Sequence, residues 1–219
     1  MAAPLPVILL HAAGRTPQMW QSQVEAIATR VPDGSEGPAV VAPWLAGLRP
    51  GRPMDLSLST AAEEVLTTMD RHGITSARLV GHQLGAMVAL QVATTEPEAV
   101  AGLVLSGALM SPSAMAMRMH RTVIRLMPKS TLAGSGATKA DLLRALELIA
   151  TADFGKHLDQ VQVPALVIAG NTDPGRASAQ KLAKQLPSGS YLEISGAGAN
   201  PSMEATEIYN DHLLDFLFS

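Results

Sequence analysis

The sequence predicts an α/β fold in which a mostly parallel sheet of about six strands is flanked by helices. Short apolar runs rich in valine, leucine and isoleucine alternate with segments of helical periodicity along the 219 residues. The strand runs are almost continuously apolar, as strands that are buried on both faces usually are. The length and the 47% apolar content suit one domain with a full-sized core.

The first half of the chain supplies four of the strands and three of the helices. Trp20, Val24 and Ile27 recur at helical spacing in the first helix. Ser59 or Thr60 is the predicted cap of the second helix. The strands are predicted at 6–10, 39–42, 78–80 and 100–105, and the helices at 18–30, 59–72 and 84–95.

The second half begins with an interruption of this rhythm. Residues 107–160 contain two helical stretches, at 114–126 and 139–152, separated by a Gly-Ser-Gly turn. We therefore predict a core formed by 1–106 and 161–219, with 107–160 inserted as a short helical cap. The core is completed by strands at 165–169 and 191–194 and by helices at 177–186 and 204–218.

Composition excludes several classes of function. A formal charge of −3 without a basic cluster argues against a nucleic-acid partner. The absence of cysteine excludes disulfides and thiolate sites, and no spacing of His, Asp and Glu predicts a metal or cofactor site. No apolar run approaches the ~18 residues of a membrane span. We expect a cytoplasmic protein without a membrane partner.

The most informative motif is Gly81-His82-Gln83-Leu84-Gly85, which lies between a predicted strand and a predicted helix. This context is the one that the G-x-S-x-G nucleophile elbow requires. In such an elbow the central residue sits on a strained turn, and the flanking glycines let the strand approach the helix closely. The central residue of this motif is Gln83.

With three further motifs, the chain resembles the α/β-hydrolase superfamily, in particular its small esterase, lactonase and C–C-hydrolase members with a helical cap. His11-Ala12-Ala13-Gly14 is similar to the family's oxyanion loop, although Ala12 replaces a glycine. The segment 163–174 is similar to the strand and loop that carry the triad acid, and 196–201 to the loop that carries the histidine. The resemblance covers the chain from His11 to its last helix.

Position by position, the resemblance implies that two triad members are replaced. Gln83 occupies the nucleophile position and Ala199 the histidine position, whereas Asp173 remains as the acid. The backbone amides of Ala13 and Leu84 would still form an oxyanion hole, because backbone N–H groups do not depend on the side chain.

These replacements remove the ordinary reaction of the family. A glutamine amide is not a useful nucleophile, and alanine cannot act as a base. We therefore expect no ordinary serine-hydrolase turnover. We also expect Gln83 to lean into the space left at Ala199, with its amide approaching Asp173 directly or through a water. Asp173 is then a candidate general base for a non-covalent reaction.

Other side chains are candidates for the wall of a ligand pocket. His11 and His82 adjoin the two motifs, and both histidines are usually structural in this family. The cap segment is rich in methionine, a flexible and polarizable residue that suits an adaptable apolar wall. The predicted pocket residues are His11, His82, Met110, Met115, Met119 and His120.

Three functions remain open from the sequence. One is a serine hydrolase, altered by divergence or by design, that still binds a small apolar carbonyl or ester-like ligand. The second is a lyase, isomerase or cyclase that uses Asp173 and the oxyanion hole. The third is a binding protein without catalysis.

Overall fold

Six strands form one parallel sheet in the part of the chain that the computed structural model describes, namely residues 4–32, 35–49, 56–108, 114–132, 134–135, 137–154 and 157–219. The order across the sheet is β2-β1-β3-β4-β5-β6, and every neighbouring pair is parallel. This arrangement confirms the predicted fold class. The strands are β1 (Val7–Leu10), β2 (Val40–Val41), β3 (Ala77–His82), β4 (Val100–Ser106), β5 (Ala165–Gly170) and β6 (Gly189–Ile194).

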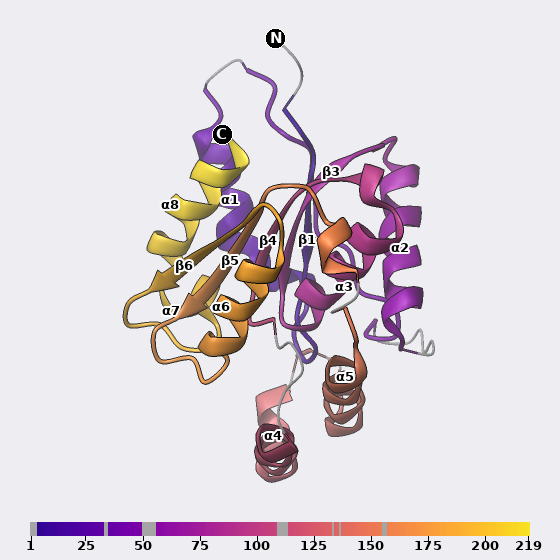
Figure 1. Ribbon diagram of the computed structural model, residues 1–219, viewed down its shortest axis with the longest axis vertical. Helices are drawn as coiled ribbons and strands as arrows, with labels where there is room; N and C mark the ends of the chain where they lie inside the picture. Colours follow the sequence, from indigo (N-terminus) through magenta and orange to yellow (C-terminus); the bar gives the residue numbers. More distant parts are fainter. Residues whose placement is uncertain are drawn as a thin grey trace.

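Helices cover both faces of the sheet (Figure 1). In β1, Ile8 and Leu10 point into one hydrophobic core, whereas Val7 and Leu9 point into the other. Because side chains alternate along a strand, a run of four apolar residues serves both faces. The first face is covered by α2 (Leu58–Arg71), α3 (Leu84–Thr95) and α6 (Arg176–Gln185), and the second by α1 (Gln21–Arg30) and α8 (Thr206–Leu217).

Two helix boundaries differ from the prediction. Ser57, rather than Ser59 or Thr60, caps α2, because its side chain accepts a hydrogen bond of 3.0 Å from the backbone N–H of Thr60. The last helix, predicted over 204–218, begins two residues later at Thr206, since Ala205 has the non-helical angles φ −139° and ψ 56°. A short α7 (Pro201–Glu204) precedes that residue, with proline at a favourable first position.

The segment predicted as the cap contributes α4 (Ala114–Leu126) and α5 (Lys139–Thr151), which lie below the layered core in Figure 1. Thr138 and Asp141 form a capping box at the start of α5. Short 3-10 turns occur at Pro17–Trp20, Pro97–Ala99, Lys129–Leu132 and Leu158–Gln160. The division of the chain into a core and a cap at residues 107 and 160 stays a prediction.

None of the helices in the described ranges is both long enough and apolar enough to span a membrane.

Candidate functional site

The turn between β3 and α3 has the backbone of a nucleophile elbow. Gln83 has φ 49° and ψ −111°, and it is the one residue other than glycine with a positive φ in the described parts of the chain. Its N–H donates to the carbonyl of Ser106 (2.8 Å), and its own carbonyl accepts from Ala86 and Met87, so the helix begins at once. The strained conformation is thus fixed by hydrogen bonds on both sides.

The two glycines of this turn are required by close packing. A Cβ atom on Gly85 would lie 2.1 Å from the carbonyl oxygen of Leu10, and one on Gly81 would lie 2.5 Å from the backbone of Gly85. Both distances are far inside van der Waals contact, and the atoms met are backbone atoms that cannot rotate away. The glycines therefore hold α3 directly against β1 and β3.

The loop after β1 comes close to the cap. Gly14 has φ 74°, and the N–H of Arg15 donates to the carbonyl of Ala12 (3.2 Å), which closes a tight turn. A Cβ on Gly14 would lie 2.7 Å from Leu142 of α5. This turn brings Ala13, Gly14 and Arg15 under the cap helices.

His11 has a structural role beneath this loop. It is fully buried, its Nε2 accepts the N–H of Leu45 (3.1 Å), and its Nδ1 donates to the carbonyl of Ala12 (2.9 Å). The ring packs edge-on against Trp44, with 5.4 Å between the centroids. Burial lowers the pKa of His11 to about 4, so the imidazole is neutral near pH 7.

His82 is buried behind the elbow in a second polar network. Its Nδ1 lies 2.9 Å from the hydroxyl of Ser106, and its Nε2 lies 3.0 Å from the side-chain oxygen of Asn200. Burial is the main cause that lowers the pKa of His82 to about 4. A neutral ring carries one N–H, which Nε2 donates to Asn200, while Nδ1 accepts from Ser106. His82 therefore links the elbow to the loop before α7.

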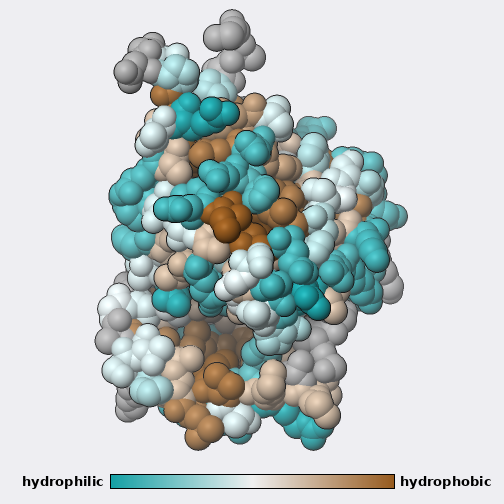
Figure 2. All heavy atoms as spheres, turned by 90° about the vertical axis from the view of Figure 1, so that its left-hand side faces the viewer, coloured by the Kyte–Doolittle hydropathy of each residue, from teal (hydrophilic) through white to brown (hydrophobic). Residues whose placement is uncertain are grey.

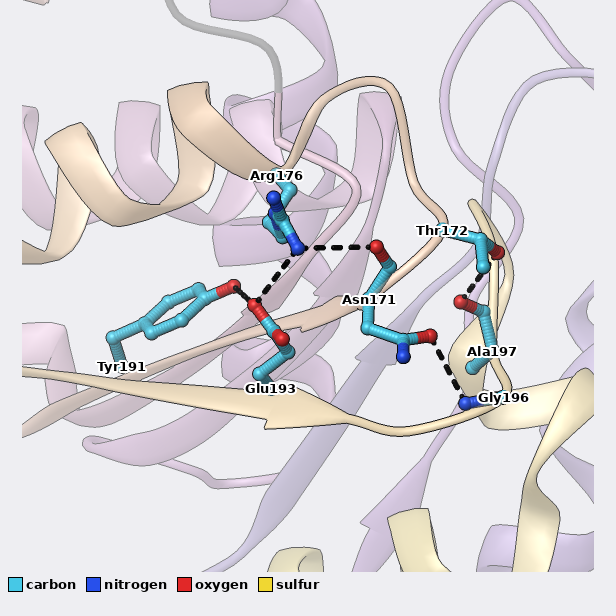
Figure 3. A network of polar contacts seen from close by, with 7 residues as sticks. All are labelled: Asn171, Thr172, Arg176, Tyr191, Glu193, Gly196 and Ala197. Atoms are coloured by element: carbon cyan, nitrogen blue, oxygen red, sulfur yellow. Dashed lines mark hydrogen bonds and ion pairs between the residues drawn. The ribbon is translucent and has the colours of Figure 1, made fainter.

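The loops after β5 and β6 are joined by hydrogen bonds (Figure 3). The side-chain oxygen of Asn171 accepts the N–H of Gly196 (3.0 Å), and the hydroxyl of Thr172 donates to the carbonyl of Ala197 (2.8 Å). Close to these loops, a guanidinium nitrogen of Arg176, the first residue of α6, lies 3.6 Å from a carboxylate oxygen of Glu193 on β6. These contacts fix the position of the loop that carries Asp173 relative to the loop that carries Ala199.

The elbow, the loop after β1 and the loops after β5 and β6 meet at one cavity of about 380 Å³. It lies between the carboxyl ends of the strands and the cap helices, and its wall is mainly apolar. The core contributes Ala13, Gly14, Arg15, Gln83, Leu84, Gly107, Asp173, Pro174, Gly175, Ala199 and Asn200. The segment 114–151 contributes His120, Val123, Ile124, Met127, Thr131, Leu132, Leu142, Ala145, Leu146 and Ile149.

Six of the residues singled out in the sequence lie together in this wall, namely Gln83, Asp173, Ala199, Ala13, Leu84 and His120. The N–H of Leu84 belongs to the first turn of α3, so it has no acceptor within the helix. The carboxylate of Asp173 is half-buried and accepts the N–H of Gly175 (2.7 Å).

The direct hydrogen bond expected between Gln83 and Asp173 is not present. No hydrogen bond joins these two side chains, both of which are described. The Cγ of Gln83 lies beside Gly107, where an added Cβ would be 2.9 Å from it. Gly107 has φ 62° and no Cβ atom, so it leaves room for the side chain of Gln83.

The other predicted pocket residues lie elsewhere. His11 and His82 are buried beneath the cavity and do not line it. Met115 and Met119 are 74% and 50% exposed and do not line the cavity. Met110 lies outside the described residues. The sequence predicted the helix that borders the cavity, but it did not predict which side of that helix faces the cavity.

The lining residues that were not predicted include Arg15, Gly107 and Asn200. Arg15 directly follows the glycine of the oxyanion-like loop, and Asn200 follows Ala199, so proximity to the motifs was a usable signal for both. Gly107 follows β4, and nothing in the sequence distinguished it. Among the described residues, no group of three or more His, Asp and Glu side chains is placed to hold a metal ion.

The chain belongs to the alpha/beta hydrolase family, whose model matches residues 7–211. Solved structures have the same fold. An enol-lactonase from Burkholderia xenovorans LB400 superposes with a TM-score of 0.80 at 19% identity, covering 100% of this chain and 93% of its own. An esterase from Exiguobacterium antarcticum superposes with a TM-score of 0.82 at 13% identity, covering 100% and 94%.

The curated relatives share one name, "Putative carbamate hydrolase RutD". The protein of that name from Pseudomonas savastanoi is 29% identical over 199 aligned positions, covering 75% of this chain and 76% of the relative. The one from Serratia proteamaculans is 26% identical over 249 aligned positions, covering 97% of this chain and 91% of the relative. The chain is therefore an alpha/beta hydrolase with similarity to these proteins and to esterases.

Proposed function

We propose that this chain is an altered serine hydrolase that binds a small apolar carbonyl compound and does not turn it over by the ordinary acyl-enzyme route. The observation that carries the proposal is the identity of the side chain at the elbow. Gln83 has the strained backbone of a nucleophile, faces a cavity, and bears an amide that cannot attack a carbonyl.

The histidine position supports the same conclusion. Ala199 lines the cavity with Gln83, and it follows the loop that is fixed to the Asp173 loop. The buried neighbours His82 and His11 do not replace the missing base, because neither lines the cavity and both have pKa values of about 4. Asp173 thus shares the cavity wall with an alanine at the position where the family carries its histidine.

Binding remains available after these replacements. The cavity is mainly apolar, and the amides of Ala13 and Leu84 lie in its wall, where an oxyanion hole would polarise a carbonyl. The relatives named as carbamate hydrolases, and the esterase and lactonase folds, suggest a carbonyl next to oxygen or nitrogen as the ligand group.

A fluorophosphonate probe tests the loss of the nucleophile. Such probes label the activated serine of serine hydrolases, so we expect no labelling of this chain under conditions that label an active esterase fully. We also expect hydrolysis of p-nitrophenyl butyrate at the rate of the buffer. Labelling at any serine would contradict the proposal, since it would reveal an activated nucleophile elsewhere in the chain.

A second candidate function is a non-covalent elimination, isomerisation or cyclisation. It is favoured by the half-buried carboxylate of Asp173, which faces the same cavity as the two backbone amides. Here Asp173 would remove a proton next to the carbonyl, and the amides would hold the resulting enolate oxygen. The pH–rate profile should then lose its acidic limb in Asp173→Asn. An unchanged profile would show that Asp173 is not the base of the reaction and has a structural role.

A further inference from the structure

The wall of the cavity contains one positive charge that the proposed function does not use. Arg15 lines the cavity beside Gln83 and Asn200. The turn at Gly14 fixes its backbone, and its side chain is solvent-exposed at the cavity mouth. Its charge also acts on the elbow, as one of the secondary causes that lower the pKa of His82. Arg15 therefore lies within electrostatic reach of the ligand position.

Nothing in the described structure neutralises this guanidinium. Arg15 makes no ion pair with a carboxylate of the described residues. Two carboxylates around the elbow make other hydrogen bonds: Asp173 accepts the N–H of Gly175, and Glu204 accepts from the N–H of Gly198 and the side-chain amide of Asn200. The donors of Arg15 are consequently available to a ligand.

We propose that the ligand of this cavity is a monocarboxylate, with its carboxylate on Arg15 and its apolar body between α4 and α5. This inference rests on the proposed binding function and adds the charge of the ligand. A guanidinium presents its N–H groups in a planar fork that matches a carboxylate. The apolar walls of Leu142, Leu146 and Ile149 suit the remainder of such a molecule.

The charges in the cavity wall favour a ligand that carries a single negative charge. Arg15 is the one arginine or lysine among the described lining residues, and Asp173 contributes a carboxylate to the same wall. A dianion such as a phosphate monoester would meet one cation and one repelling anion. A ligand carboxylate needs only one cation, which Arg15 supplies. This carboxylate stays away from Asp173 if the carbonyl group of the ligand lies at the elbow, between Arg15 and Asp173.

Binding of two nearly isosteric probes tests the inference. 4-Phenylbutanoate and 4-phenylbutanamide differ mainly in charge, and isothermal titration calorimetry measures both on the full chain. We expect the acid to bind about tenfold or more tightly than the amide, because a hydrogen bond to a charged group contributes more than a neutral one. We expect phenylbutyl phosphate to bind more weakly than the acid.

Variants locate the effect. Arg15→Gln should weaken binding of the acid about tenfold and leave binding of the amide unchanged, while Arg15→Lys should keep part of the preference. Arg30→Gln, an exposed arginine at the end of α1, removes the same charge far from the cavity and should change neither. Both substitutions are on the surface, so the fold is expected to persist, which circular dichroism checks.

The outcomes separate this inference from the function on which it rests. If the amide binds as tightly as the acid, or if Arg15→Gln weakens both equally, the carboxylate assignment is wrong and the binding function stands. Tighter binding of the phosphate would replace the monocarboxylate by a dianion. If neither the acid nor the amide binds the unaltered chain, both proposals are overturned.

Discussion

The two sides of the cavity are built in opposite ways. The sheet edge is held largely by backbone atoms: Gly85 lies against the carbonyl of Leu10, and the loops after β5 and β6 are joined by a backbone hydrogen bond from the N–H of Thr172 to the carbonyl of Ala197 (3.0 Å). The cap side is held by side chains, and α4 exposes Met115, Met119 and Leu126 to solvent. Figure 2 shows apolar side chains on the surface toward the cap end of the molecule. Geometry that is held by backbone atoms does not depend on which side chain stands at position 83, whereas the side chains of α4 and α5 contribute to the shape and polarity of the cavity.

Glycine substitutions test this contrast with the largest expected effect. Gly85→Ala places a methyl group 2.1 Å from a backbone oxygen, so we expect the free energy of unfolding to fall by about 4 kcal/mol or more, with most of the protein insoluble. Gly134→Ala in the cap segment meets nothing within 4 Å, and its φ of 88° alone should cost about 1–2 kcal/mol. Urea unfolding of soluble protein measures both. Equal losses would contradict the contrast.

Acidification tests the polar side of the sheet edge. His11 and His82 have pKa values of about 4 in the folded chain and 6.5 when exposed, so the unfolded state binds protons first as the pH falls. The stabilisation from the neutral rings is complete above pH 6.5 and is lost down to about pH 4, at about 1.4 kcal/mol per pH unit for each histidine. Urea midpoints at pH 7, 6 and 5 measure the slope.

A matched variant assigns that slope. His82→Gln keeps a hydrogen-bonding side chain but removes the titrating group, so the dependence on pH should fall by about half. An unchanged slope would show that His82 is protonated in the folded chain, and the tautomer assigned to it would be wrong.

Truncation of leucine compares the packing of the two sides. Leu79 is completely buried in the sheet, and Leu79→Ala should cost near the upper end of the ~2–5 kcal/mol range for such changes. Leu146 faces the cavity, where fewer atoms surround it, so Leu146→Ala should cost about 2 kcal/mol or less. Thermal unfolding of the two variants gives the comparison. A larger loss at Leu146 would mean that the cap is packed as tightly as the core.

The smallest effect is expected at Asp173. Asparagine keeps an oxygen that accepts the N–H of Gly175, so Asp173→Asn should change the free energy of unfolding by less than about 1 kcal/mol. Asn171→Ala removes the acceptor of Gly196 and should cost more. The reverse order in urea unfolding would make the carboxylate a structural support of the loop rather than a group available to a ligand.

The sequence predicted most of the sheet edge and less of the cap. Strand runs and the glycines around Gln83 are local signals, so the fold class, the parallel sheet and α3 follow from residues close in the chain. The break at Ala205 was missed because neither glycine nor proline marks it in the sequence. The contact of Gln83 with Gly107 was missed because it joins two loops whose approach depends on the register of β3 and β4.

The positions of the methionines show the same limit. The helix predicted at 114–126 is present, yet Ile124 and Met127 line the cavity while Met115 and Met119 are exposed to solvent. The rotation of α4 is set by its packing on α5, a contact between distant segments. Arg15 was overlooked for a related reason, since its place in the wall follows from the turn at Gly14.

The central claim is that a hydrolase frame persists around an altered reaction centre. Its most direct test is the double variant Gln83→Ser with Ala199→His, assayed on p-nitrophenyl butyrate beside both single variants. If the backbone of the elbow and the loops is intact, the pair should raise the rate at least about 10³-fold over the unaltered chain and allow fluorophosphonate labelling of the new serine, whereas neither single variant should. A double variant that unfolds at the same temperature as the parent, but neither hydrolyses the ester nor reacts with the probe, would contradict the claim.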